Sequence, residues 1–216
     1  MNDNLEISAG RISINKKGLI FAILWFAGFI WFFAAQIIAA DAWVDPPYDW
    51  REQNVSDLGQ LGYPLSIMMN TAFIFQGAVM ASGVWVIEAI WNKTFLPAIA
   101  RTMMGLTGVG FIIVGVTPYN VIPIIHSIFG AFPIMLFSSV ALILSGMAKN
   151  REHFGKFWIV TIVIGFVALA SGILFFTGMG LWMGRGLLER IWIYAPLVWT
   201  LIISCRVMHL YRHSPN

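Results

Sequence analysis

The sequence predicts an all-α, polytopic integral membrane protein, with six transmembrane helices in one bundle. Only 11% of the 216 residues are charged, against about 25% in an average soluble domain. The chain is 59% hydrophobic, and its mean hydropathy is +0.79. Apolar runs close to the roughly 20 residues that a helix needs to cross a bilayer recur along the chain. Together these observations argue against a water-soluble fold.

Six apolar segments have the length of a membrane span, and they are 19–40, 65–87, 97–116, 123–147, 156–178 and 190–210. The first follows basic residues, as in a signal peptide. Its apolar core is longer than the 7–15 residues typical of such a peptide, so we expect it to be retained. Pro64, Pro97 and Pro123 stand near the starts of the next three segments, where a helix tolerates proline. Three polar residues within the spans are expected to form hydrogen bonds between helices: Gln36, Asn70 and Gln76.

The positions of lysine and arginine predict the orientation of the chain. With six alternating spans, three of the 13 basic side chains, Arg51, Arg185 and Arg190, fall on one side and the other ten on the opposite side. Because basic loops stay in the cytoplasm, we expect a protein of the plasma (inner) membrane with both termini cytoplasmic. The predicted organisation is a cytoplasmic segment 1–18, a membrane domain 19–210 and a cytoplasmic tail 211–216.

The loop between the first two spans, residues 41–63, is acidic and lies on the outer side in this topology. Its acidic residues are Asp41, Asp45, Asp49, Glu52 and Asp57, against Arg51 as its one cation. The stretch from Asn54 to Asp57 is typical of a helix cap. We therefore expect a short helix here, ended by Gly59.

A histidine in the fourth span is the strongest single candidate for a functional side chain. His126 lies about one turn inside an apolar segment, where lipid offers the imidazole no water. Pro133 lacks a backbone donor and leaves the carbonyl of Phe129 without its helical partner. Because Phe129 follows His126 by three residues, we expect both features on one side of the helix. The structural alternative is an imidazole that is satisfied by a carbonyl or carboxylate of a neighbouring helix.

Polar residues at the outer ends of the spans predict a pocket. The candidate ligand-binding residues are Asp57, Tyr119, Asn120, His126, Glu189 and Arg190. They share one membrane depth, so a bundle of six helices can gather them. His126 and Asp57 are also the candidates for catalysis, as a general base and the carboxylate that orients it. The structural alternatives are a capping role for Asp57, and a salt bridge between Glu189 and Arg190 at the membrane surface.

Metal ions, cofactors and nucleic acid are not expected. The chain has four histidines, and three of them, His153, His209 and His213, fall on the cytoplasmic side of the predicted topology. The outer side therefore lacks the three or four ligands of a zinc site. The glycines of 178–186 lack the strand–turn–helix context of a phosphate-binding loop. The basic residues are scattered between spans rather than clustered on one face, as a nucleic-acid interface requires.

Three motifs resemble those of a known family, and they are Asn54-Val-Ser-Asp57-Leu-Gly59, His126…Gly130-Ala-Phe-Pro133 and Gly186-Leu-Leu-Glu189-Arg190. They stand in this order before the second span, in the fourth span and at the opening of the sixth. From the first span onward the chain resembles the six-span membrane proteins of archaea and bacteria catalogued as domain of unknown function 998. The resemblance implies a six-helix fold and a recurrent polar set at the Ser-Asp, His and Glu-Arg positions. It implies no activity.

The function that we expect is binding of a lipid headgroup or a small amphiphile in an outward-facing polar pocket. The reason is that polar groups, which are costly in a membrane, concentrate at one depth. Membrane lipid is the expected partner. Two alternatives stay open: a membrane-embedded lipid hydrolase or transferase that uses His126 and Asp57, and a non-catalytic accessory or scaffold subunit of a membrane complex.

Overall fold

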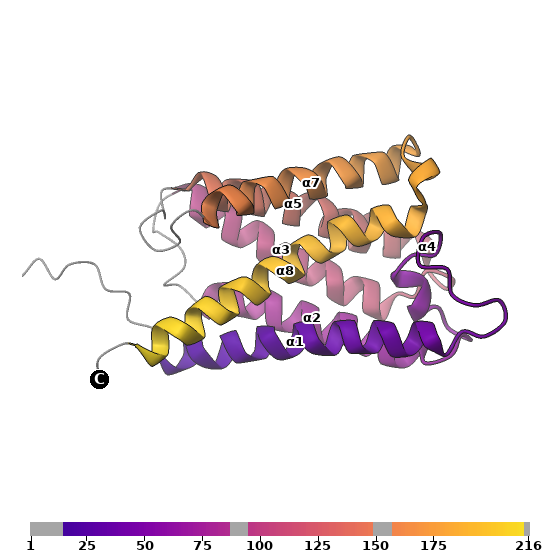
Figure 1. Cartoon of the computed structure of the whole chain (residues 1–216), viewed down its shortest axis with the longest axis horizontal. Helices are drawn as coiled ribbons and strands as arrows, with labels where there is room; N and C mark the ends of the chain where they lie inside the picture. Colours follow the sequence, from indigo (N-terminus) through magenta and orange to yellow (C-terminus); the bar gives the residue numbers. More distant parts are fainter. Residues whose placement is uncertain (1–14, 87–94, 149–156, 214–216) are drawn as a thin grey trace, which may run out of the picture.

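Six long helices dominate the computed structural model, which describes residues 15–86, 95–148 and 157–213 (Figure 1). They are α1 (Lys16–Asp41), α2 (Ser66–Val86), α3 (Phe95–Val116), α5 (Phe132–Met147), α7 (Phe157–Thr177) and α8 (Arg185–Arg212). The shorter elements are two 3₁₀ turns, η1 (Ser56–Gly59) and η4 (Leu181–Met183), one turn of α-helix, α4 (Pro123–Ile125), and a π-helical turn, η3 (His126–Ala131). No strand occurs in the described ranges. His153 and most of the predicted N-terminal segment lie outside them.

Each of the six predicted spans contains a helix that is long and apolar enough to cross a membrane. The fourth comprises α4, η3 and α5 in continuous succession, from Pro123 to Met147. The chain is therefore an all-α, multi-pass membrane protein, as predicted. The sixth helix begins five residues earlier than predicted, at Arg185. Glu189 and Arg190 consequently lie in the second turn of α8 rather than at its opening.

The helices pack in chain order, and α8 closes the ring. Each long helix contacts the next along the chain, and α8 contacts both α7 and α1. In Figure 1, α8 crosses the bundle from the end of α7 to the start of α1. Both ends of the described chain therefore lie at one end of the bundle. The opposite end, which we call the loop end, carries the connections 42–65, 117–122 and 178–184.

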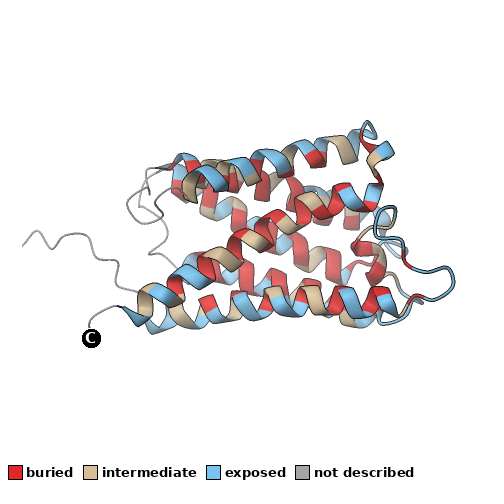
Figure 2. Cartoon of the chain, in the orientation of Figure 1, coloured by how far each residue is buried: buried red, intermediate tan, exposed pale blue. Residues whose placement is uncertain are grey.

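Aromatic rings from three helices fill the centre of the bundle. Phe32 of α1, Phe73 of α2 and Phe111 of α3 are fully buried. Their ring centroids lie 5.1 to 6.0 Å apart. Figure 2 shows buried residues on the inward sides of the helices and exposed residues on the outer sides. The exposed outer sides of α1 and α7 are largely apolar, as expected of surfaces that face lipid.

The three polar residues inside the spans differ in their partners. Gln36 and Tyr194 exchange two hydrogen bonds between α1 and α8: the Gln36 amide donates to the phenol oxygen at 2.6 Å, and the phenol donates back at 2.9 Å. The prediction of an interhelical bond is confirmed for this residue. The Asn70 amide instead donates to the carbonyl of Gly59 in η1, at 2.8 Å. Neither amide atom of Gln76 has a hydrogen-bond partner among the described residues.

Glycines bring α2 and α3 into backbone contact. A Cβ atom added at Gly77 would lie 2.5 Å from the carbonyl oxygen of Gly108, and one added at Gly108 would lie 2.5 Å from the backbone nitrogen of Ala81. Small residues at such crossings let helices approach closely in lipid, where packing replaces the hydrophobic drive for association. Any side chain at these two positions must separate the helices.

We expect Gly108→Ala to lower the stability of the protein by roughly 1–3 kcal/mol, because the added methyl group overpacks the crossing. The change is measured as a lower thermal unfolding midpoint of the purified protein in mild detergent. Gly105→Ala is the matched control one turn away. Its added Cβ meets neighbouring atoms only at 3.5 Å or more, so its midpoint should not fall. Equal midpoints for the two variants would contradict the assigned crossing.

Candidate functional site

The connection between α1 and α2 folds back over the loop end of the bundle. Two of its residues, Val55 and Leu58, are fully buried. The Asp57 carboxylate accepts hydrogen bonds from the backbone N–H of Asn54 at 2.8 Å and from the Gln60 amide at 2.7 Å. The predicted short helix is confirmed as η1. Its N-cap residue is Val55, without a side-chain capping bond, and Asp57 lies in its first turn. Both oxygens of this carboxylate therefore hold the loop in shape.

Glu189 binds the loop from the start of α8. The helix begins after Gly184, whose φ of +99° favours glycine. Glu189 is only 2% exposed. Its carboxylate accepts hydrogen bonds from the backbone N–H of Val55 and, at 3.1 Å, from the Ser56 hydroxyl. A buried carboxylate needs such donors, because burial removes the water that would otherwise solvate it.

Arg190 binds the same loop through a different set of oxygens. Nη1 donates to the carbonyls of Trp50 at 2.7 Å, Gln53 at 2.9 Å and Gly186 at 2.8 Å. Nη2 donates to the phenol oxygen of Tyr48 at 2.5 Å. No ion pair links Arg190 to Glu189 among the described residues. Arg190 is 7% exposed, so the predicted surface salt bridge is wrong: both charges are buried, and each binds its own set of groups. The Nε of Arg190 has no partner among the described residues.

His126 lies at the start of the π-helical turn. Its Nδ1 is 2.7 Å from the carbonyl oxygen of Thr117. Because a carbonyl only accepts, Nδ1 carries a proton in this arrangement. Nε2 is buried and has no partner among the described residues. The ring of Tyr119 contacts the imidazole edge-on, with centroids 5.6 Å apart. A carbonyl of the connection after α3 thus pairs with one ring nitrogen, and the other nitrogen has no partner within the described part of the chain.

The π-helical turn also changes what surrounds His126. The backbone N–H of Phe132 donates to the carbonyl of Ser127, five residues earlier, so the turn before Pro133 is wider than an α-helical turn. His126 is 3% exposed, whereas Phe129 is 57% exposed. The expectation that both residues face one side is wrong, because it assumed the angular spacing of an α-helix.

The six predicted site residues all lie at the loop end but do not form one site. Glu189 and Arg190 bind the loop, and Tyr119 contacts His126. Asp57 and Asn120 form hydrogen bonds within and between the connections. Asn120 donates to the carbonyl of Leu61 at 2.8 Å and accepts from the N–H of Leu61 at 3.0 Å. It thereby ties two connections together. Ligand binding by these residues stays a prediction.

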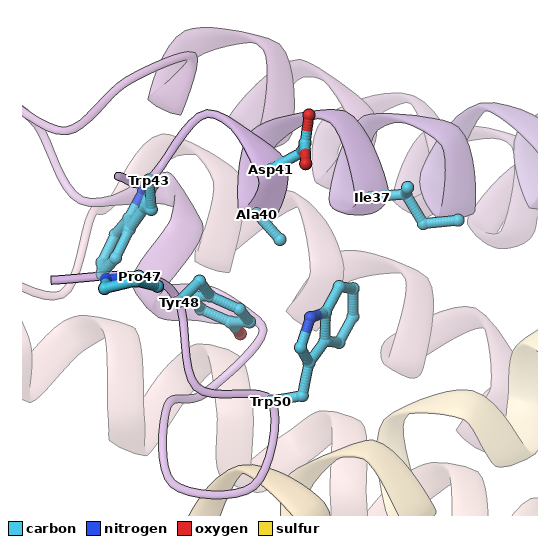
Figure 3. Close-up of a pocket in the computed structure, with 7 residues that line it drawn as sticks. All are labelled: Ile37, Ala40, Asp41, Trp43, Pro47, Tyr48 and Trp50. Atoms are coloured by element: carbon cyan, nitrogen blue, oxygen red, sulfur yellow. The ribbon is translucent and has the colours of Figure 1, made fainter. Parts of the chain in front are cut away.

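A pocket of about 280 Å³ lies beside them, between the end of α1 and the loop (Figure 3). It is lined by Ile37, Ala40, Asp41, Trp43, Pro47, Tyr48 and Trp50. None of the six predicted site residues lines it. The sequence signal was a run of aromatic and acidic residues directly after the first span. An interpretation of these tryptophans as interfacial anchors does not reveal that they meet.

Aromatic rings in edge-to-face contact form one wall of the pocket, which we call the aromatic wall. The ring of Tyr48 meets those of Trp43 and Trp50 edge-on, with centroids 5.4 and 5.3 Å apart. The guanidinium of Arg190 lies 4.9 Å from the centroid of the Trp50 ring and 5.5 Å from that of Tyr48. Arg190 does not line the pocket, so it contacts these rings from outside the pocket. Burial raises the pKa of Tyr48 despite the nearby guanidinium, which keeps the phenol neutral.

We expect Arg190→Ala to destabilise the protein by about 3 kcal/mol, because it removes the donor that several loop oxygens share. Hydrogen exchange of residues 48–56 should become faster, as measured by mass spectrometry of the protein in detergent. Arg185→Ala removes the same charge from the first turn of α8, where the guanidinium packs on the exposed side of Phe175. It should leave exchange in the loop unchanged. Similar exchange in both variants would contradict the anchoring role.

The chain matches one family model over residues 26–206, and the family is described as "Protein of unknown function (DUF998)". The match includes the loop, the π-helical turn and the start of α8. Searches among curated proteins and among solved structures find no significant match. The resemblance drawn from the three sequence motifs is confirmed: the chain belongs to the DUF998 family of membrane proteins.

Proposed function

We propose that this protein binds a lipid headgroup or a small amphiphile in the pocket at the loop end. The observation that carries the proposal is the course of the pocket along α1. Ile37, at one end, is apolar and 57% exposed, on a helix side that faces lipid. Asp41 lies one turn further along, about 6 Å at 1.5 Å per residue. The pocket thus leads from hydrocarbon depth to a polar end, which suits a molecule with an apolar chain and a polar head.

We also propose that the pocket faces outward from the plasma membrane, with both termini in the cytoplasm. The described basic residues support this orientation. Lys16 and Lys17 open α1, and Arg206 and Arg212 lie in the last turns of α8, all at the end opposite to the pocket. Positively charged residues at helix ends favour the cytoplasmic side. The pocket then opens at the outer surface of the membrane.

The geometry favours binding over the hydrolase alternative. In the hydrolase alternative, the Asp57 carboxylate orients His126 as a general base. Asp57 instead accepts hydrogen bonds from Asn54 and Gln60, and the imidazole pairs with the carbonyl of Thr117. The pocket contains neither His126 nor Asp57 in its lining. The proposal therefore assigns these two residues to the support of the loop end.

We expect Trp50→Ala to reduce the amount of co-purified lipid to less than half, because the pocket loses one of its walls. Native mass spectrometry of the protein in mild detergent measures the lipid retained per chain. The backbone carbonyl that binds Arg190 is kept in this variant. Trp182→Ala is the control, since Trp182 is 77% exposed at the same end of the bundle and does not line the pocket. Equal lipid retention in both variants would refute the proposed binding site.

A further inference from the structure

We propose that the polar end of the pocket takes an ammonium group, so that its preferred occupant carries a zwitterionic headgroup with an ammonium and a phosphate. This inference rests on the proposed function and specifies the chemistry of the ligand. Three features of the pocket support it: its one charged lining residue, its aromatic wall and an unpaired indole N–H.

Asp41 supplies the negative charge. Among the described residues that line the pocket it is the one with a charge, and the residue is exposed. Among the described residues no hydrogen-bond donor or cation is paired with it. Asp41 is also the last residue of α1, where the partial negative charge of the helix C-terminus adds to that of the carboxylate. Both effects favour a cation.

The aromatic wall supplies the second interaction with a cation. Trp43, Tyr48 and Trp50 all line the pocket (Figure 3), and the faces of such rings attract ammonium groups. The same rings already contact one cation, since Arg190 lies within 5.5 Å of two of their centroids. That guanidinium donates to four oxygens and lies outside the pocket lining. Of the three rings, Trp50 is 43% exposed and is the one that is most accessible to a ligand.

The surrounding charges agree with this assignment. The cation of the loop itself is Arg51. It donates to the backbone carbonyls of Trp182 at 2.8 Å and Met183 at 3.2 Å, and it pairs with Glu52 at 3.5 Å. It is thus directed toward the α7–α8 connection. The loop carries five acidic residues against this one arginine, so its net potential attracts cations to the mouth of the pocket.

The indole of Trp43 supplies a complementary donor. This residue lines the pocket and is 7% exposed. Its Nε1 is buried without a hydrogen-bond partner among the described residues. A buried N–H without an acceptor is unfavourable, and a phosphate oxygen of the same headgroup provides one. An ammonium near Asp41 and a phosphate near Trp43 together describe a zwitterionic headgroup.

The test compares two probes that share one acyl chain, lysophosphatidylcholine and lysophosphatidylglycerol, on the full-length protein in mild non-ionic detergent. Binding is measured by native mass spectrometry, and folding of each variant by size-exclusion chromatography. We expect the choline probe to bind at least ten-fold more tightly than the glycerol probe. Asp41→Asn should weaken the choline probe about ten-fold and leave the glycerol probe unchanged. Glu52→Gln, which removes an equal charge from the same loop outside the pocket, should keep the preference.

Tetramethylammonium chloride distinguishes the two sources of an ammonium group. Displacement of the choline probe by this salt would identify the free cation as sufficient, and lack of displacement would identify the headgroup of a lipid as the ligand. Equal affinity for both probes, or an unchanged preference in Asp41→Asn, would overturn the ammonium inference and leave the proposed function standing. If Trp50→Ala alters the binding of neither probe, the proposed function itself fails.

Discussion

The arrangement of the loop end depends on how two adjacent buried charges are satisfied. Glu189 and Arg190 lie in a membrane-spanning helix, where an unpaired charge is strongly unfavourable. Instead of pairing with each other, they bind the backbone and side chains of residues 48–56. Because these charges bind oxygens and N–H groups at fixed positions, they stabilise the conformation of the loop. The positions of the aromatic residues that line the pocket depend on that conformation.

The polar groups at the loop end thus divide by the state of their hydrogen bonds. Asp57, Asn120, Glu189 and Arg190 have partners within the protein, and these bonds hold the connections over the bundle. Asp41 has none among the described residues and is one of the residues that line the pocket. A side chain whose bonding capacity is already used stabilises the fold, whereas one with free capacity is available to a ligand. Under the proposed function, this distinction assigns ligand binding to Asp41.

The fold was predictable from the sequence to a greater degree than the pocket. Long apolar runs identify spans, because lipid requires helices of that length, and the polar residues from Asn54 to Asp57 predicted η1 through local capping. The π-helical turn at His126 was missed, since it depends on packing around Pro133 that no short pattern reports. The earlier start of α8 also escaped prediction, because Gly184 and Arg185 look like loop residues until Gly184 adopts a positive φ. The pocket arises from rings that meet only in three dimensions.

The interlocked phenylalanines at the bundle centre have a consequence for traffic across the membrane. Phe32, Phe73 and Phe111 fill the space between α1, α2 and α3 at the middle of the protein. Under the proposed function, a lipid in the pocket beside α1 therefore enters from the adjacent leaflet and not between these three helices. Its exchange would follow the composition of that leaflet.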